Sequence, residues 1–152
     1  MEEPLAYPLI FLTKKYLSAL SKEISTLSID RYFYVLILID NHDENLSQKI
    51  LADLLQIDKS YMVTILNYLE DHGYILRQKN AYDRREQLIK LTSKAKEDIP
   101  LIRNAISELN NRSLKNISES KKQIFNDVLR IMQSNLSDIV LNKSCSLLKN
   151  FN

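Results

Sequence analysis

An Asp-Arg-Arg triplet, Asp83 to Arg85, carries the strongest candidate chemistry in this chain, in a polar stretch between two strand-like runs. A guanidinium group at the tip of a loop can enter a DNA minor groove, where the potential is most negative over narrow A·T-rich stretches. The carboxylate of Asp83 would repel phosphate, so we expect it to orient Arg85 through an ion pair instead. The alternative is that Arg84 and Arg85 are only solvated loop residues.

The runs on either side of this loop, Tyr74 to Arg77 and Gln87 to Leu91, show the partial apolar alternation of β-strands. They predict a hairpin whose tip holds the arginines. Gly73, the only glycine of the chain, comes directly before the first run. It lies one residue beyond a predicted helix, where a left-handed residue is favoured.

Two short helices precede the hairpin. Ser47 can cap the first, which runs to Leu55, and Asp58 can cap the second, which runs from Lys59 to His72. The side chains expected to face inward are Ile50, Leu51, Leu54 and Leu55 in the first helix and Met62, Ile65, Leu66 and Leu69 in the second. Two such helices across a short turn form a helix-turn-helix, whose second helix fits a DNA major groove. A hairpin directly after it would be the wing of a winged helix.

Polar side chains on the outward face of the second helix complete the candidate DNA interface. An asparagine can form two hydrogen bonds with adenine, whereas Thr and Tyr can contact a thymine methyl or a phosphate. Tyr61 and Tyr68 suit packing equally well. The candidate DNA contacts are Ser47, Lys59, Ser60, Tyr61, Thr64, Asn67, Tyr68, Arg77, Arg84 and Arg85.

Several of these pieces, in order and at fixed spacing, resemble the MarR family of bacterial transcriptional regulators. The resemblance is carried by Leu51-Ala52-x-Leu54, Leu69-Glu70-x-x-Gly73-Tyr74-Ile75-x-Arg77, Asp83-x-Arg85 and Leu91-Thr92. Family members often place a Ser or Thr followed by Arg midway along the recognition helix. The corresponding pair here is Val63-Thr64, so this arginine is missing.

The remaining sequence predicts more helix on both sides of this region. Residues 7–25 carry apolar side chains at helical spacing, and residues 32–39 form an apolar run that propensity allows as a strand and length favours as a buried helix. A long helix from Thr92 to about Leu114 contains Pro100, which predicts a kink or a late start. A last helix follows Ser118. We therefore expect a mainly α fold with a small β-hairpin wing, the winged helix-turn-helix being flanked by N- and C-terminal dimerisation helices.

In this organisation, residues 1–152 form a single domain. Residues 29–92 form the DNA-binding region, and residues 5–28 and 93–150 form the helical dimerisation region. A homodimer would present two reading heads to a palindromic operator in double-stranded DNA. The alternative is that the long helices fold over one another as a monomeric bundle.

Composition sets limits on the function. The net charge is only +2, so DNA binding must come from a local patch. The single cysteine, Cys145, and the absence of a signal peptide or a long apolar run predict a cytoplasmic protein without a membrane partner. We find no spacing of ligands for a metal, no cofactor motif and no catalytic motif, so we expect neither a cofactor nor an enzyme.

The predicted function is a dimeric, sequence-specific transcriptional regulator. The resemblance implies a repressor relieved by a small-molecule effector, whose cleft Tyr7, Tyr16, Tyr32, Phe33 and Tyr34 could line. Two alternatives remain open at this point. One is a winged helix used for protein–protein contact, and the other is a ligand-binding dimer without operator binding.

Overall fold

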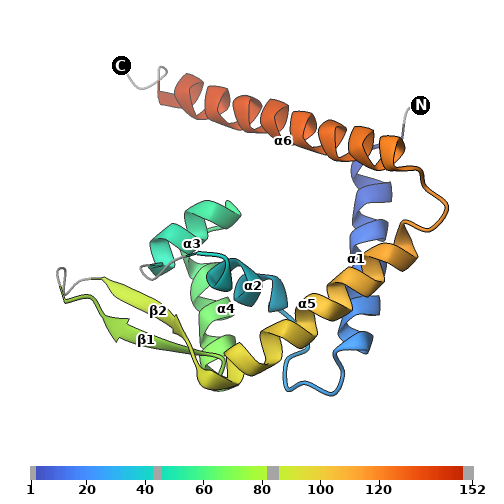
Figure 1. Cartoon of the computed structure of the whole chain (residues 1–152). Coiled ribbons are helices and arrows are strands. Elements are labelled where there is room, and N and C mark those ends of the chain that lie inside the picture. Colours follow the sequence, from blue (N-terminus) through green and yellow to red (C-terminus); the bar gives the residue numbers. More distant parts are fainter. Residues whose placement is uncertain (1–2, 43–45, 82–85, 149–152) are drawn as a thin grey trace. The chain divides into compact units, whose positions relative to one another are not determined.

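The computed structural model describes residues 3–42, 46–81 and 86–148, with side chains to residue 137, and Figure 1 shows its helices and strands. In chain order these are α1 (Ala6–Glu23), α2 (Phe33–Asp40), α3 (Gln48–Leu55), α4 (Lys59–Asp71), β1 (Ile75–Lys79), β2 (Gln87–Leu91), α5 (Ser93–Ser113) and α6 (Glu119–Leu148). The predicted fold class, mainly α with one antiparallel hairpin, is confirmed.

The chain divides into two compact units, Met1–Asn110 and Asn111–Asn152. The first contains α1 to α4, the hairpin and most of α5, and the second contains α6. The expected division into a DNA-binding region at 29–92 and a dimerisation region at 5–28 and 93–150 stays a prediction.

The core of the first unit is built around α2 and α4. The apolar run that propensity allowed as a strand is the helix α2, and its Val35 and Leu36 are completely buried. Since the run is apolar on nearly every side, it suits a helix that is enclosed by other elements. The inward residues predicted for α4, which are Met62, Ile65, Leu66 and Leu69, are all buried.

Both predicted caps of the helix-turn-helix are present. The Ser47 hydroxyl accepts a bond from the Ile50 N–H, and the Asp58 carboxylate accepts one from the Tyr61 N–H. Between the two helices Gln56 adopts a left-handed conformation (φ +52°), and the Ile57 N–H bonds to the carbonyl of Ala52. These bonds end α3 and turn the chain into α4.

The inward face predicted for α3 is partly wrong. Leu51 is buried and Leu55 is half-buried, but Ile50 and Leu54 are exposed, and Ala52 is buried in their place. Four apolar positions in one short helix span more than a single face. The packing of α3 against α4 and β2 decides which of them are covered.

Gly73 ends α4 as the sequence predicted, in a left-handed conformation with φ +74°. The Tyr74 N–H bonds to the carbonyl of Leu69 at 2.8 Å, and the Gly73 N–H bonds to that of Glu70 at 2.9 Å. This is the Schellman pattern, which satisfies carbonyls that the helix end leaves without partners. It also fixes the direction in which the chain enters β1.

The hairpin pairs Ile75 with Leu91 and Lys79 with Gln87 in antiparallel register. Thr92 closes its base, because its N–H bonds to the carbonyl of Tyr74. The Thr92 hydroxyl donates to the Gly73 carbonyl at 2.7 Å and accepts the Ala95 N–H at 3.2 Å. The same side chain thus ties the end of α4 to the start of α5.

The helix α5 begins at Ser93 and continues through Pro100 to Ser113. The late start that Pro100 suggested is therefore wrong, because the Thr92 cap begins the helix well before the proline. Pro100 itself is exposed, as is suitable for a residue that leaves one backbone carbonyl without its helical partner. In the parts of the chain that the structure describes, no helix has both the length and the apolar character needed to cross a membrane.

Gly73→Ala should lower the free energy of unfolding by roughly 1–2 kcal/mol, the usual cost of a left-handed conformation for a residue with a Cβ atom. An added Cβ would meet only the Cδ atom of Lys94 at 3.9 Å, so steric overlap does not contribute. Urea unfolding measures the change. Gln56→Gly, the reverse exchange at another left-handed site, should stabilise by about 0.5 kcal/mol. A Gly73→Ala variant as stable as the parent would contradict this account.

Candidate nucleic-acid interface

The N-terminal half of α4 presents a polar face to solvent. The polar residues of this face, which are Lys59, Ser60, Tyr61, Thr64 and Asn67, are all exposed, and so is Val63. Met62, Ile65 and Leu66, which lie between them in sequence, are buried in the core. The Thr64 hydroxyl bonds back to the Ser60 carbonyl at 3.3 Å, within the helix. Residues of this kind on the second helix of a helix-turn-helix can reach base edges and phosphates.

A carboxylate stands at the beginning of this face. Asp58 accepts the Tyr61 N–H at 2.8 Å and the Ser60 hydroxyl at 2.5 Å. The hydrogen bond from Ser60, followed by the one from the Tyr61 N–H, lowers the pKa of the Asp58 carboxyl. Asp58 therefore stays ionised and already uses one N–H of the helix start, so an approaching phosphate depends more on Lys59.

Arg77 connects the wing to the recognition helix. Its guanidinium forms an ion pair with Glu70 through Nη1 and donates from Nη2 to the Asn67 Oδ1 at 2.7 Å. The Arg77 backbone N–H also bonds to Glu70, at 3.3 Å. The Arg77 side chain is only 16% exposed. Its first role is therefore to hold β1 against α4.

Tyr68, another sequence-predicted contact, is half-buried among polar and aromatic neighbours. Its hydroxyl donates to Asp30 at 2.6 Å, and its ring stacks on His72 with centroids 4.0 Å apart. The Tyr32 ring meets Tyr68 edge-on at 5.3 Å. Burial, together with the bond to Asp30, raises the pKa of the Tyr68 hydroxyl. Its hydroxyl is engaged within the protein.

Tyr61 and Ser47 lie in contrasting surroundings. Tyr61 remains exposed, with its ring edge-on to Tyr32 at 6.4 Å, so it can both pack and touch DNA. Ser47 is buried, and its hydroxyl caps α3. Ser47 is therefore not among the DNA contacts that we propose.

The predicted wing tip, Asp83, Arg84 and Arg85, lies outside the described residues. The base of the loop is described, and Asn80 binds Glu86 across it. The Asn80 N–H bonds to the Glu86 carbonyl at 3.0 Å, and its Nδ2 bonds to the Glu86 carboxylate at 2.9 Å. These bonds hold together the two ends from which the tip extends.

Sequence reasoning missed the parts played by Glu70 and Asp30. Glu70 lies three residues after Asn67, so both share one helix face, and that spacing was available as a signal. The pairing of Asp30 with Tyr68 spans 38 residues, and the sequence offered no signal for it.

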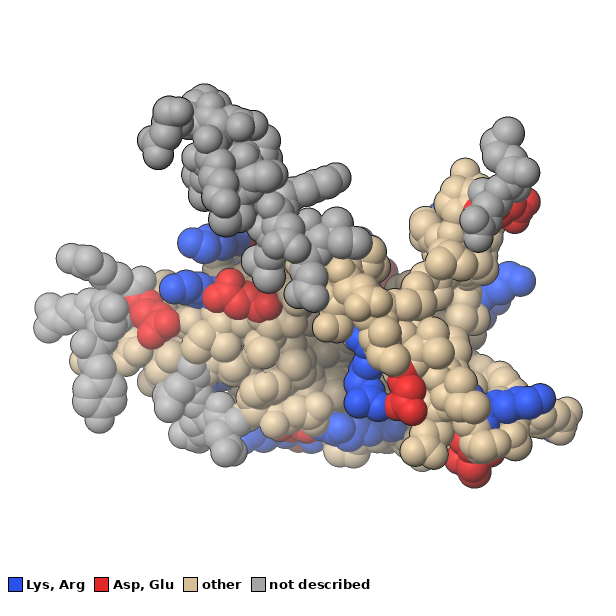
Figure 2. All heavy atoms as spheres, turned by 90° about the horizontal axis from the view of Figure 1, so that it is seen from above, with Lys and Arg blue, Asp and Glu red and all other residues tan. Residues whose placement is uncertain are grey.

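Acidic side chains accompany the cations of the interface, since Asp58 directly precedes Lys59 and Glu70 pairs with Arg77. Among the described residues on the face drawn in Figure 2, basic side chains lie beside acidic ones. This agrees with a net charge of only +2. Attraction to DNA must therefore come from a few well-placed cations.

The aromatic residues suggested for an effector cleft lie in different surroundings. Phe33 is buried in the core, and the Tyr16 hydroxyl bonds to Asn110 at 2.7 Å. A cavity of about 210 Å³ lies instead between the end of α2, β2 and the start of α5, with His42, Lys90 and Lys96 in its wall. In the described residues no group of three or more His, Cys, Asp or Glu side chains is placed to hold a metal ion.

The two capped helices across a tight turn, with a hairpin bound to the second helix, define a winged helix-turn-helix. The MarR family profile matches residues 31–87, which include α2, α3, α4 and β1. The middle of the chain therefore resembles the MarR family.

Two curated relatives support this assignment. The uncharacterized HTH-type transcriptional regulator YdgJ of Bacillus subtilis is 28% identical over 98 residues, which are 64% of this chain and 60% of that protein. The match thus spans less than two thirds of that relative. The HTH-type transcriptional regulator BilQ of Clostridioides difficile is 24% identical over 119 residues, which are 78% of this chain and 80% of that protein.

Solved structures show the same fold. A MarR transcriptional regulator from Methanosarcina mazei Go1 superimposes with a TM-score of 0.78 and 25% identity, covering 89% of this chain and 97% of that one. The transcriptional repressor CouR, bound to a 23-mer DNA duplex, gives a TM-score of 0.76 at 20% identity, with 86% and 92% covered. These proteins are transcriptional regulators, and the family is not one of enzymes.

Asp30→Asn should destabilise the protein near neutral pH, and the difference should shrink as the pH falls below about 4. The hydrogen bond from Arg31, followed by the one from Tyr68, lowers the pKa of the Asp30 carboxyl. A lowered pKa in the folded state gives stability that is fully present above the unfolded pKa, about 4, and is lost progressively as the pH falls from there through the folded pKa. Urea unfolding at pH 7, 5, 4 and 3 measures the difference. Tyr68→Phe removes one of the two bonds and should show a smaller effect with the same pH dependence. A constant Asp30→Asn difference from pH 7 to 3 would refute the assignment.

Proposed function

We propose that this protein is a homodimeric, sequence-specific DNA-binding transcriptional repressor, which a small-molecule effector releases from its operator. The observation that carries the proposal is the exposed polar face of α4 in a winged helix-turn-helix whose fold matches that of a DNA-bound repressor. In this proposal α4 enters the major groove and the wing reaches the neighbouring minor groove. A regulator of this kind would act in the cytoplasm, where bacterial DNA lies.

The DNA contacts that we propose fall into two groups. Lys59, Ser60, Tyr61, Thr64 and Asn67 come from the exposed face of α4. Arg84 and Arg85 come from the wing tip, with Asp83 orienting Arg85. Arg77 and Tyr68 support these residues from within the module, since their polar groups are bound to other side chains.

Exposed apolar surface supports the dimer. On α1 and at its N-cap, Leu5, the exposed apolar residues are Leu5, Tyr7, Leu9, Ile10, Phe11, Leu12 and Leu17. On α6 they are Ile124, Phe125, Val128, Ile131 and Leu136. Soluble monomers rarely leave so much contiguous apolar surface in water, so each helix needs a partner surface. A second copy of the chain supplies one and doubles the number of reading heads.

Relief by an effector requires a ligand that binds one spacing of the two heads better than the other. A cavity between α2, β2 and α5 has Lys90 and Lys96 in its wall beside Asp40, whose carboxylate is paired with Arg103, and this mixed wall suits a small polar molecule. Because β2 leads directly into α5 through Thr92, a ligand held there touches both the wing and the helix that follows it.

Binding to the region upstream of the protein's own gene tests the central proposal. In a gel shift across a salt series, the logarithm of the specific affinity should fall linearly with the logarithm of salt concentration. Absence of any specific shift would favour a winged helix for protein–protein contact or a ligand-binding dimer.

Arg85→Ala should weaken specific binding by about 1–3 kcal/mol if the arginine makes a good base-edge contact. Fluorescence anisotropy with a labelled operator at one fixed salt concentration measures the loss. Lys22→Ala is the matched control, because it removes one positive charge from the last turn of α1, outside the winged helix. Equal, small losses for both variants would mean that only overall charge matters and that the wing does not touch DNA.

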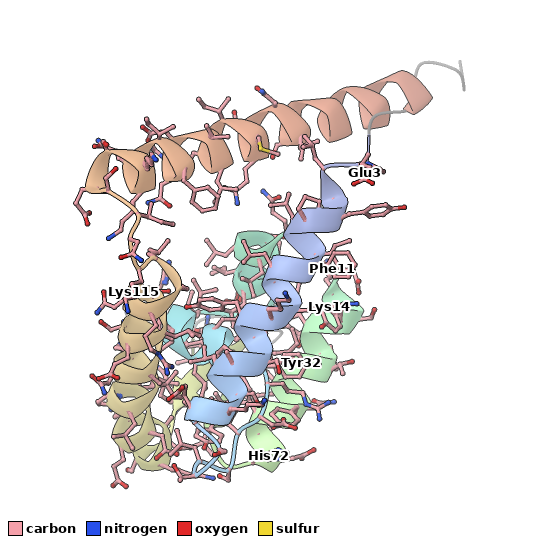
Figure 3. All side chains as sticks on the ribbon, turned by 90° about the vertical axis from the view of Figure 1, so that its right-hand side faces the viewer. Glu3, Phe11, Lys14, Tyr32, His72 and Lys115 are labelled. Atoms are coloured by element: carbon pink, nitrogen blue, oxygen red, sulfur yellow. The ribbon has the colours of Figure 1, made fainter. Side chains whose placement is uncertain are left out.

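Phe11→Glu should shift the protein from a dimer toward its 17.8 kDa chain, because a carboxylate would have to enter an apolar contact. Phe11 is 63% exposed on α1, and Figure 3 shows it on the same helix as Lys14. Analytical ultracentrifugation at micromolar concentration gives the mass. Lys14→Glu, a change at an exposed polar site of this helix, should leave the dimer intact. Wild-type protein that sediments only as the single chain would favour the monomeric bundle.

A further inference from the structure

The side-chain amide of Asn67 is held in one orientation by an arginine from the neighbouring strand. Arg77 donates from Nη2 to the Asn67 Oδ1 at 2.7 Å. A guanidinium has only donors, so the atom that it contacts on the amide must be the oxygen, and the amide cannot be reversed without losing the bond. The NH₂ group of Asn67 therefore points away from Arg77.

Arg77 is in turn fixed from its other side. Glu70 forms an ion pair with Nη1, and its second carboxylate oxygen accepts the Arg77 backbone N–H. Asn67 and Glu70 lie three residues apart on one face of α4, so a single guanidinium spans both. With the Arg77 side chain only 16% exposed, water does not easily replace these contacts.

The fixed orientation of the Asn67 amide determines which hydrogen-bonding groups it offers to a DNA base. Asn67 is exposed on α4, and within the described chain its Nδ2 has no hydrogen-bond partner. A bidentate contact with adenine needs the amide oxygen to accept from N6 while the nitrogen donates to N7. Turning the oxygen into the groove would break its bond to the Arg77 guanidinium. Guanine presents two acceptors, O6 and N7, which an amide that offers only N–H groups can satisfy.

We propose that Asn67 is a specificity-determining residue that reads a guanine as a hydrogen-bond donor, and that Arg77 is the positioning residue that sets this preference. The inference rests on the proposed function, since it needs α4 to lie in the major groove. It reverses the ordinary expectation that an asparagine on a recognition helix selects adenine.

Selection from a randomised duplex library with the wild-type protein tests operator binding and the base preference of Asn67 separately. If no sequence is enriched, operator binding itself is refuted, and the proposed role of Asn67 is refuted with it. If a palindrome is enriched, the function stands, and the variants decide the role of Asn67. Asn67→Ala should abolish the preference at one base pair in each half-site, and the wild type should favour guanine over adenine there by roughly tenfold. Adenine at that position, or no position affected, would overturn the proposal.

Arg77→Met and Arg77→Lys then separate positioning from simple structural support. Releasing the amide with Arg77→Met should bring the guanine-to-adenine ratio at the Asn67 position close to one. Arg77→Lys keeps a cationic donor for Oδ1 and should retain part of the preference. Glu70→Gln weakens the anchor of Arg77 and should shift the ratio in the same direction, so it serves if Arg77→Met melts below the assay temperature. Uniform loss of affinity with an unchanged ratio in these variants would show that Arg77 only supports the fold, and would overturn its assigned role.

Discussion

The junction between α4 and β1 constrains the rest of the structure. The left-handed Gly73 lets the Tyr74 N–H reach back to the Leu69 carbonyl, and that bond sets where the hairpin leaves the helix. Thr92 binds the Gly73 carbonyl and caps α5, so the return strand and the following helix start from the same point. Lys94 adds a bond to the last carbonyl of this turn, that of His72, and lies 4.3 Å from the centre of the Tyr74 ring. A recognition helix, a wing and a long connecting helix are thereby fixed at one place in the chain.

Such a junction could be predicted from the sequence because its signals are local. A single glycine after a periodic run, a serine and an aspartate before apolar turns, and two short alternating runs each specify their own conformation. Burial within α3 was harder to predict. Ile50 and Leu54 are as apolar as Leu51, and only packing against α4 and β2 separates the covered side from the exposed one. Pro100 allowed either a kink or a late helix start, and the cap at Thr92 excludes the late start because it begins α5 before the proline.

In the candidate site, too, local sequence signals predicted some residues, whereas contacts between distant elements decided the others. The outward residues of α4 follow from helical period alone, and the structure leaves Lys59, Thr64 and Asn67 exposed. The side chains that support them could not be predicted, because their partners come from other elements. Arg77 has the composition of a phosphate contact, yet its guanidinium is placed between Glu70 and Asn67. Tyr68 likewise gives its hydroxyl to Asp30, from the segment before α2.

These internal bonds leave little positive charge for DNA. Arg77 is neutralised by Glu70, and Asp58 places a carboxylate at the very start of α4. Of the described residues on the outward face of α4, Lys59 is the cation at the helix start. Even with the proposed wing contacts, Arg84 and Arg85, a single head has few cations for phosphate. Since phosphate neutralisation supplies most non-specific affinity, such a head would bind weakly by itself. Pairing two heads makes the second contact intramolecular and raises its effective concentration without a further cation in either head. In the dimer that we propose, the exposed apolar surface of α1 would thus compensate for the modest net charge, because it would pair two heads that each bind weakly.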